Sequence, residues 1–127
     1  MSQYHAQTRS NYFRVKSLPS FWAWIENYGF QVITSDEDDS LVGFMGERDI
    51  PEIDPETGAE INFTRELAGH LAEEEVAIFQ EVGSENLRYL NGIAVAVNHL
   101  GESEEISLFD IHDLARKLGK NVTPCEY

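Results

Sequence analysis

The side chains in this sequence that could carry chemistry are four histidines, one cysteine and 23 aspartates and glutamates. A catalytic site in so short a chain would show a nucleophile beside its base, a metal-binding pair or a phosphate loop. No G-x-S-x-G, H-E-x-x-H or Walker pattern occurs. Cys125 lies between Pro124 and Glu126, without a neighbouring base to activate its thiol. The sequence therefore predicts a protein that is not an enzyme and has no catalytic residues.

Metal binding has two candidates, and neither has the spacing of a known ligand set. One would join His99 and His112 with a glutamate. The other is an EF-hand-like calcium loop, with its positions 1, 3, 5 and 12 at Asp36, Asp38, Ser40 and Glu47. Leu41 stands at position 6 of that loop, where glycine is needed for the sharp turn. We therefore expect no metal site and no cofactor.

The charge is the most informative property of the chain. Its net value is −14, whereas a magnitude of about 2–8 is ordinary for a small domain. Residues 36–113 contain 21 of the 23 acidic residues and three of the nine basic ones, a net charge of −18; the two ends together carry +4. Direct binding to nucleic acid or to an anionic membrane needs a basic footprint. The sequence therefore favours a basic protein as partner.

The carboxylates of the middle segment occur in clusters, and we expect these to gather on one flank as the partner-binding surface. Alternate side chains on a strand face repeat at about 6.6–6.8 Å. DNA carries one charge per roughly 1.7 Å of axis, so such clusters could imitate its row of anions. The candidate partner-binding residues are Asp36, Glu37, Asp38, Asp39, Glu47, Asp49, Glu52, Asp54, Glu56, Glu73, Glu74 and Glu75, together with Trp22 at the edge of an apolar helix face.

The elements that would position these residues predict one α+β domain. Strands are expected at 11–16, 30–35, 41–46, 76–82, 87–99 and 104–108, with helices at 17–28 and 63–71. At Asn91-Gly92 the pattern allows a hairpin turn, but favours a glycine bulge in one bent strand. A last helix would begin near Ser107 and bury a stripe formed by Leu108, Ile111, Ala115 and Leu118, with Leu114 beside it.

This element order predicts an antiparallel sheet of about five or six strands, with two or three helices packed on one face. The expected boundaries are a flexible tail over residues 1–10, a single domain over 11–120 and a second tail over 121–127. The N-terminus lacks an apolar signal segment, and no apolar run reaches the roughly 20 residues of a membrane span. We therefore expect a cytoplasmic protein without membrane contact, and the oligomeric state stays open.

In size, acidity and lack of catalytic motifs, the whole chain resembles the anti-CRISPR and anti-restriction inhibitors of phages and mobile elements. This resemblance implies inhibition of a nucleic-acid-handling defence complex, as a DNA mimic or by another acidic contact. Two alternatives remain: an immunity protein or antitoxin that neutralises a basic toxin, and a small enzyme or ligand-binding domain with an unfamiliar site. A third interpretation is an accessory domain whose acidity is incidental.

Overall fold

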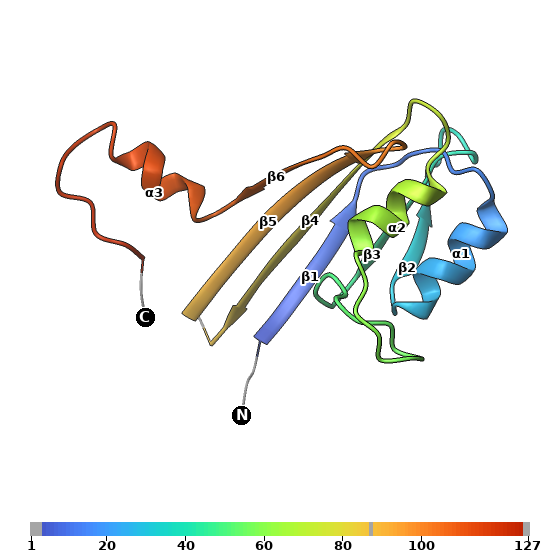
Figure 1. The fold of residues 1–127 in the computed structure, drawn as a ribbon, viewed down its shortest axis with the longest axis horizontal. Helices are drawn as coiled ribbons and strands as arrows, with labels where there is room; N and C mark the ends of the chain where they lie inside the picture. The colour runs from blue at the N-terminus through green and yellow to red at the C-terminus, as the bar shows by residue number, and fades with distance from the viewer. Residues whose placement is uncertain (1–3, 87, 126–127) are drawn as a thin grey trace.

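The computed structural model describes residues 4–86 and 88–125, and it contains one six-stranded antiparallel sheet (Figure 1). The strand order across the sheet is β2-β3-β1-β4-β5-β6. The strands are β1 (Tyr4–Ser10), β2 (Gln31–Thr34), β3 (Val42–Gly46), β4 (Val76–Glu85), β5 (Arg88–Asn98) and β6 (Ser103–Ser107). The helices are α1 (Leu18–Asn27), α2 (Phe63–His70) and α3 (Asp110–Ala115). The predicted α+β fold class is confirmed.

Both larger helices form where the sequence predicts them, because their ends carry strong local signals. Ser17 caps α1 by accepting a hydrogen bond from the backbone N–H of Ser20 at 3.3 Å. Gly29 ends α1 with a φ of +82°, a left-handed conformation that glycine adopts without a steric penalty. Asn62 caps α2 by accepting from the N–H of Arg65 at 3.0 Å.

The first strand corrects the prediction of an N-terminal tail. Residues 4–10 form β1, which lies inside the sheet and pairs with both β3 and β4. Its inward side chains are Ala6, Thr8 and Ser10, which are buried but small or polar, so the segment shows no apolar alternation. The predicted strand 11–16 is wrong, because only isolated bridges form there, at Phe13 and Val15.

The core lies between the sheet and the two helices α1 and α2, and it is built from aromatic rings. Phe44 is fully buried at its centre, with its ring centroid within 6.5 Å of those of Phe13, Phe30, Phe63 and Phe79. Edge-to-face pairs at such distances add about 0.5–1.5 kcal/mol beyond the area they bury. α1 contacts β2 and α2 contacts β5, whereas the edge strand β6 lies outside this cover and has no buried residue (Figure 1).

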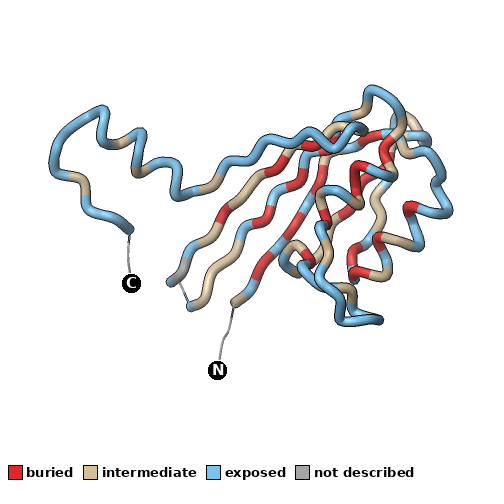
Figure 2. The backbone as a smooth tube through the Cα atoms, viewed as in Figure 1, coloured by how far each residue is buried: buried red, intermediate tan, exposed pale blue. Residues whose placement is uncertain are grey.

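The C-terminal segment departs from the expected packing. After β6 the chain leaves the sheet, and α3 stands away from the body with most of its residues exposed (Figures 1 and 2). None of the six residues of α3, all in the described part of the chain, is buried. The prediction that its apolar stripe would be buried is therefore wrong for a single copy of this chain.

The long strand β5 is continuous, which confirms one strand rather than two. The register irregularity lies opposite Gly83–Glu85 of β4, so the bulge expected at Asn91-Gly92 is displaced toward the hairpin end. At Gly92 the glycine is needed because a side chain would have no space. A Cβ on it would lie 2.8 Å from Cγ of Leu108, which packs directly over its backbone.

Candidate protein-binding surface

Two of the predicted acidic clusters meet at one end of the sheet. The β2–β3 turn and the turn before β4 both lie there, because β3 and β4 run in the same direction on either side of β1. Arg14 joins the two turns: its Nη2 contacts Oδ2 of Asp38 at 2.8 Å, and its backbone N–H donates to Oε1 of Glu75 at 2.7 Å. We call residues Asp36–Asp39 with Glu73–Glu75 the acidic pole.

Asp38 organises its own turn as well as contacting Arg14. Its Oδ1 accepts hydrogen bonds from the backbone N–H and the hydroxyl of Ser40, at 2.9 and 2.6 Å. These bonds from Ser40, followed by the nearby charge of Arg14, lower the pKa of Asp38 below its ordinary value of 3.8. The carboxylate therefore stays ionised in mildly acidic solution and holds the turn in one conformation.

The turn before β4 is also held by hydrogen bonds, although its conformation is unfavourable. The backbone N–H of Glu74 donates to Nδ1 of His99 at 3.1 Å, and that of Glu75 donates to the carbonyl of Ala72. Glu74 has a φ of +68°, in the left-handed region that costs a residue with a Cβ about 1 kcal/mol or more. A glutamate thus occupies a position that suits glycine or asparagine better, and its carboxylate is exposed.

In the part of the chain that the structure describes, most carboxylates of the acidic pole form no ion pair. The described residues form three ion pairs: Arg14–Asp38, Arg48–Asp49 and Arg116–Asp113. Two of these pairs join a base of the chain ends, Arg14 or Arg116, to a carboxylate of the acidic middle, so within the described residues the ends offset only a small part of its charge. Within the pole, the exposed carboxylates that take part in none of these pairs belong to Asp36, Glu37, Asp39, Glu73 and Glu74.

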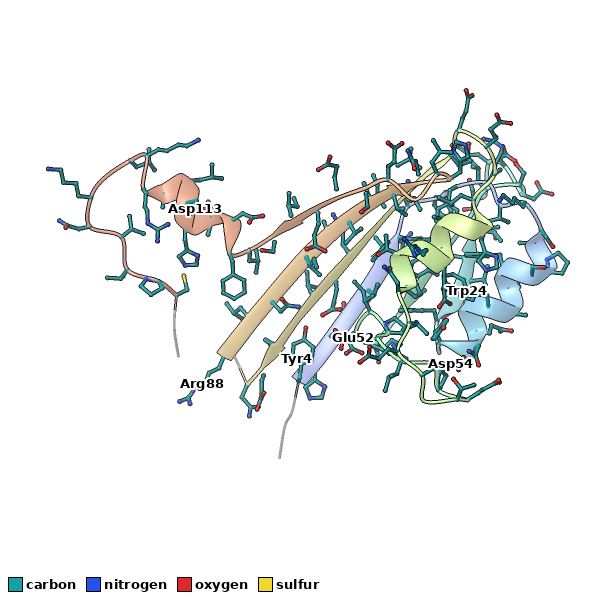
Figure 3. All side chains as sticks on the ribbon, in the orientation of Figure 1. Tyr4, Trp24, Glu52, Asp54, Arg88 and Asp113 are labelled. Atoms are coloured by element: carbon teal, nitrogen blue, oxygen red, sulfur yellow. The ribbon has the colours of Figure 1, made fainter. Side chains whose placement is uncertain are left out.

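The third predicted cluster lies elsewhere, which corrects the expectation of one common flank. Residues 47–60 follow β3 at its far end, so the strand separates them from the acidic pole. They form a small hairpin, with Ile53 bridged to Glu60 and a turn closed by Gly58 at a φ of +73°. We call residues 47–60 the acidic hairpin, and Figure 3 labels two of its residues, Glu52 and Asp54.

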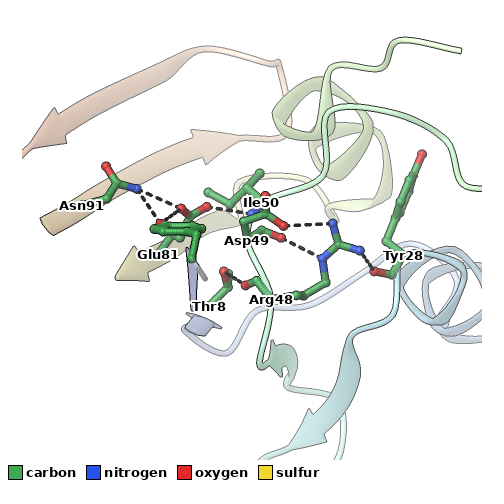
Figure 4. A network of polar contacts seen from close by, with 8 residues as sticks. Thr8, Tyr28, Arg48, Asp49, Ile50, Glu81 and Asn91 are labelled. Atoms are coloured by element: carbon green, nitrogen blue, oxygen red, sulfur yellow. Dashed lines mark hydrogen bonds and ion pairs between the residues drawn. The ribbon is translucent and has the colours of Figure 1, made fainter. Parts of the chain in front are cut away.

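The acidic hairpin is attached to the sheet by a buried carboxylate that the sequence analysis did not single out (Figure 4). Glu81 of β4 is only 7% exposed. Its Oε1 accepts from the backbone N–H of Ile50 at 2.7 Å, and its Oε2 accepts from the Tyr4 hydroxyl at 2.8 Å and Asn91 Nδ2 at 2.9 Å. Both oxygens are thus engaged, as a buried charge requires. The sequence pattern that could have identified it is alternation, since Glu81 follows Ala77 and Phe79 on the inward face of β4.

The base of the acidic hairpin has a second attachment through Arg48. The guanidinium Nη1 donates to the carbonyl of Tyr28 at 2.7 Å, and its carbon lies 5.6 Å from the ring centre of Phe30. The hydroxyl of Thr8 donates a hydrogen bond to the carbonyl of Arg48 at 2.7 Å. Arg48 also contacts Asp49 at 3.3 Å, so one of the hairpin's carboxylates already has a partner.

Trp22, the remaining predicted contact residue, lies on α1 rather than in either cluster. It is 40% exposed, on the side of α1 that faces away from the core. The neighbouring Trp24 instead turns inward, stacks on Phe63 at 5.0 Å and donates its indole N–H to Oε1 of Glu66 at 2.8 Å. No contact in the described residues brings Trp22 to a carboxylate of the acidic pole.

The two candidate metal sites do not assemble. In the calcium pattern, β3 separates Glu47 from Asp36, Asp38 and Ser40, which lie at the opposite end of that strand. In residues 4–86 and 88–125, no three histidine, cysteine, aspartate or glutamate side chains are placed to hold a metal ion together. His112, in the C-terminal segment, accepts a hydrogen bond from the backbone N–H of Cys125 at 3.2 Å.

An open hollow beside the ends of β1, β4 and β5 is the candidate binding site for a small molecule. Its lining includes Tyr4, Asn91 and Asp49. A ligand site needs polar groups that converge on free space. Here the Tyr4 hydroxyl and the Asn91 amide point to Glu81 instead, where they balance a buried charge. The hollow therefore gives no support to a particular reaction.

A second carboxylate, that of the half-buried Glu66, also has a structural role. Oε1 of Glu66 accepts hydrogen bonds from Trp24 and, at 3.0 Å, from the hydroxyl of Tyr28. Burial, followed by this bond to Glu66, raises the pKa of Tyr28 to about 12. The phenol thus stays protonated and acts as a hydrogen-bond donor that ties α1 to α2.

No protein-family model, no curated protein and no solved structure matches this chain. The function must therefore be argued from the surface itself. Among the described residues, no helix combines the length and the apolar content needed to cross a membrane.

Proposed function

We propose that this chain is a non-catalytic protein-binding domain that docks through its acidic pole on a basic surface. The observation that carries the proposal is the position of Arg14, which contacts both acidic turns and so holds them together at one end of the sheet. The five exposed carboxylates around it have no partner in an ion pair of the described residues. Their mutual repulsion costs stability, and a cationic partner would relieve it.

The hydrogen bonds within the pole make it suitable for rapid recognition. Ser40 and Arg14 fix the β2–β3 turn, while His99 and Ala72 fix the other, so little conformational entropy is lost on binding. Complementary charge raises the association rate and makes binding sensitive to salt. The resemblance to phage-borne inhibitors suggests that the partner is a basic protein of a nucleic-acid-handling complex, whose surface normally holds phosphate.

The test removes four charges from the pole and leaves its internal contacts in place. The pole variant carries Asp36→Asn, Glu37→Gln, Asp39→Asn and Glu74→Gln, and it retains Asp38 and Glu75. The matched control removes the same number of charges from the acidic hairpin, through Glu47→Gln, Glu52→Gln, Asp54→Asn and Glu56→Gln. Each protein is immobilised and exposed to a lysate of the native host, and the retained proteins are quantified by mass spectrometry.

We expect a basic protein to be retained at low salt by the original protein and by the hairpin variant, and lost from the pole variant. With that protein purified, the dissociation constant should rise at least about tenfold in the pole variant, since several charge pairs are removed. Equal retention by the two variants would refute docking through the pole. The identity of the captured protein separates an inhibitor of a defence complex from an immunity protein bound to a toxin.

A further inference from the structure

The chain carries two apolar surfaces that are largely exposed in the described residues, and the first is the C-terminal arm, residues 108–118. Its large apolar side chains are between 51% and 92% exposed, and they are Leu108, Phe109, Ile111, Leu114 and Leu118. Ile111 and Leu114 lie three residues apart on one side of α3, and Leu118 follows at helical spacing in the turn after it. Isolated helices shorter than about 12–15 residues are marginal in water, so a helix of six residues needs a surface to pack on.

The second surface is the face of the sheet opposite α1 and α2. Ladder partners directly across from each other point to the same face. Ile78 pairs with Ala96, and Ala94 pairs with Ile106, while the intervening Phe79 and Val95 point into the core. The apolar residues of this uncovered face on β4, β5 and β6 are Val76, Ile78, Val82, Ala94, Ala96 and Ile106, and the four larger ones are 41–68% exposed.

The junction between β6 and the arm directs the arm away from its own sheet. The backbone N–H of Leu108 donates to the carbonyl of Gly92 at 2.9 Å, and that of Ser107 donates to Oδ2 of Asp110 at 2.7 Å. Helical conformation begins at once, since Phe109 already has φ −65° and ψ −22°. No glycine or proline lies between Ser107 and Gly119 to reverse the chain. The arm is therefore positioned to cover a surface other than the sheet it leaves.

From these observations we infer that the chain forms a two-fold dimer in which the arm of each copy packs on the uncovered sheet face of the other. A two-fold axis makes the contact occur twice, so both apolar surfaces are covered in both copies. A stable dimer buries at least about 1,200 Å² in total. Two arms bring ten large apolar side chains, each more than half exposed in the single copy, to that interface.

Charge supports a second copy as the occupant. The end of the arm and the residues after it are basic, with Lys117, Lys120 and Arg116, which also pairs with Asp113, and with no acidic residue between 114 and 125. The body that it would contact is acidic, and Glu104 points from β6 onto the uncovered face beside Ala96. The arm thus offers both the apolar stripe and the cations that such a surface requires.

Pairing of two copies through the free edge of β6 is a competing arrangement, and the sequence of β6 disfavours it. Glu104 and Glu105 are adjacent on this five-residue strand. Two such strands aligned across a two-fold axis would bring like charges together, a common device against edge-to-edge association. The arm-to-face arrangement leaves both β6 edges in solvent and avoids this repulsion.

The test uses one charge in the arm and one in the face. Leu118→Glu changes a residue that is 92% exposed, and Ile78→Glu changes one that is 41% exposed, so neither should disturb the fold of a single copy. Leu100→Glu, at a 72% exposed residue of the β5–β6 turn, is the matched control. Circular dichroism checks the fold, and sedimentation velocity over a wide concentration range measures the dissociation constant.

We expect a dimer for the original protein and for Leu100→Glu, and at least about a 100-fold weaker dimer for each of the other two variants, because each would bury a carboxylate without a partner. Mixing Leu118→Glu with Ile78→Glu should restore a heterodimer, since one intact arm then meets one intact face. A monomeric original protein, a dimer that survives both substitutions, or a mixture without heterodimer would each overturn the inference. The acidic-pole variant should dimerise normally, so this test is independent of the proposed function.

Discussion

The two halves of this molecule contain apolar residues of similar kind, yet one half is a packed core and the other is not. Under α1 and α2, aromatic rings such as Phe44 and Phe63 are 0–3% exposed and pack against one another. Beyond β5, the arm carries Phe109 and Leu118 at 65% and 92% exposed. An amphipathic pattern shows that a segment needs a partner surface, but not whether that surface belongs to the same chain.

A similar contrast holds for the carboxylates. Glu81 is buried and surrounded by three donors, so its charge acts on the structure. The carboxylates of Asp36, Glu37 and Asp39 face solvent, where a charge acts on whatever approaches. Burial and hydrogen bonding thus separate structural from exposed acids, although both kinds carry the same charge in the sequence.

The sharpest way to test the contrast between core and arm is one substitution made in both. Phe44→Ala should lower the free energy of unfolding by about 3–5 kcal/mol, because it leaves a cavity among four rings. Phe109→Ala should change it by less than about 0.5 kcal/mol when measured on single copies at low protein concentration. Chemical denaturation measures both values. Comparable losses would show that the arm is part of the folding unit.

A smaller effect is expected when the buried carboxylate is removed. Glu81→Ala leaves the N–H of Ile50 and the donors of Tyr4 and Asn91 without their acceptor, at a cost of about 2–3 kcal/mol. Glu56→Ala, at the exposed tip of the acidic hairpin, is the control and should stay within about 0.5 kcal/mol. Proteolysis within residues 47–60 should also become faster in Glu81→Ala alone. Unchanged stability would show that Glu81 does not anchor the hairpin.

The smallest effect concerns pH and the half-buried His70 at the end of α2. Burial lowers the pKa of His70 below 6.5, against the opposing influence of Glu66. The unfolded chain therefore takes up the proton first as the pH falls, so this histidine's contribution to stability is lost from about pH 6.5 downward. In His70→Gln the free energy of unfolding should fall less steeply between pH 7 and 5 than in the original protein. Equal slopes in denaturation series across that range would contradict this.

Much of the fold was predictable because its signals are local. Ser17 and Gly29 mark the ends of α1, and Gly58 closes the turn of the acidic hairpin at a positive φ. The residues of the acidic pole were predicted from the sequence, but the separate location of the acidic hairpin was not. That location depends on contacts that Arg48 and Glu81 make with residues distant in sequence. The expected grouping of the pole with residues 47–60 failed for that reason.

The sequence by itself determined the charge, the helix caps and the turns, because each depends on neighbouring residues and on backbone conformation. Only the tertiary structure decided that Ala6, Thr8 and Ser10 lie inside the sheet and that the stripe of α3 stays exposed. The physical reason is that burial depends on the surface that comes to lie opposite a side chain. For a small or polar strand, and for an apolar helix at the end of an arm, that surface is set by contacts distant in sequence or by another molecule.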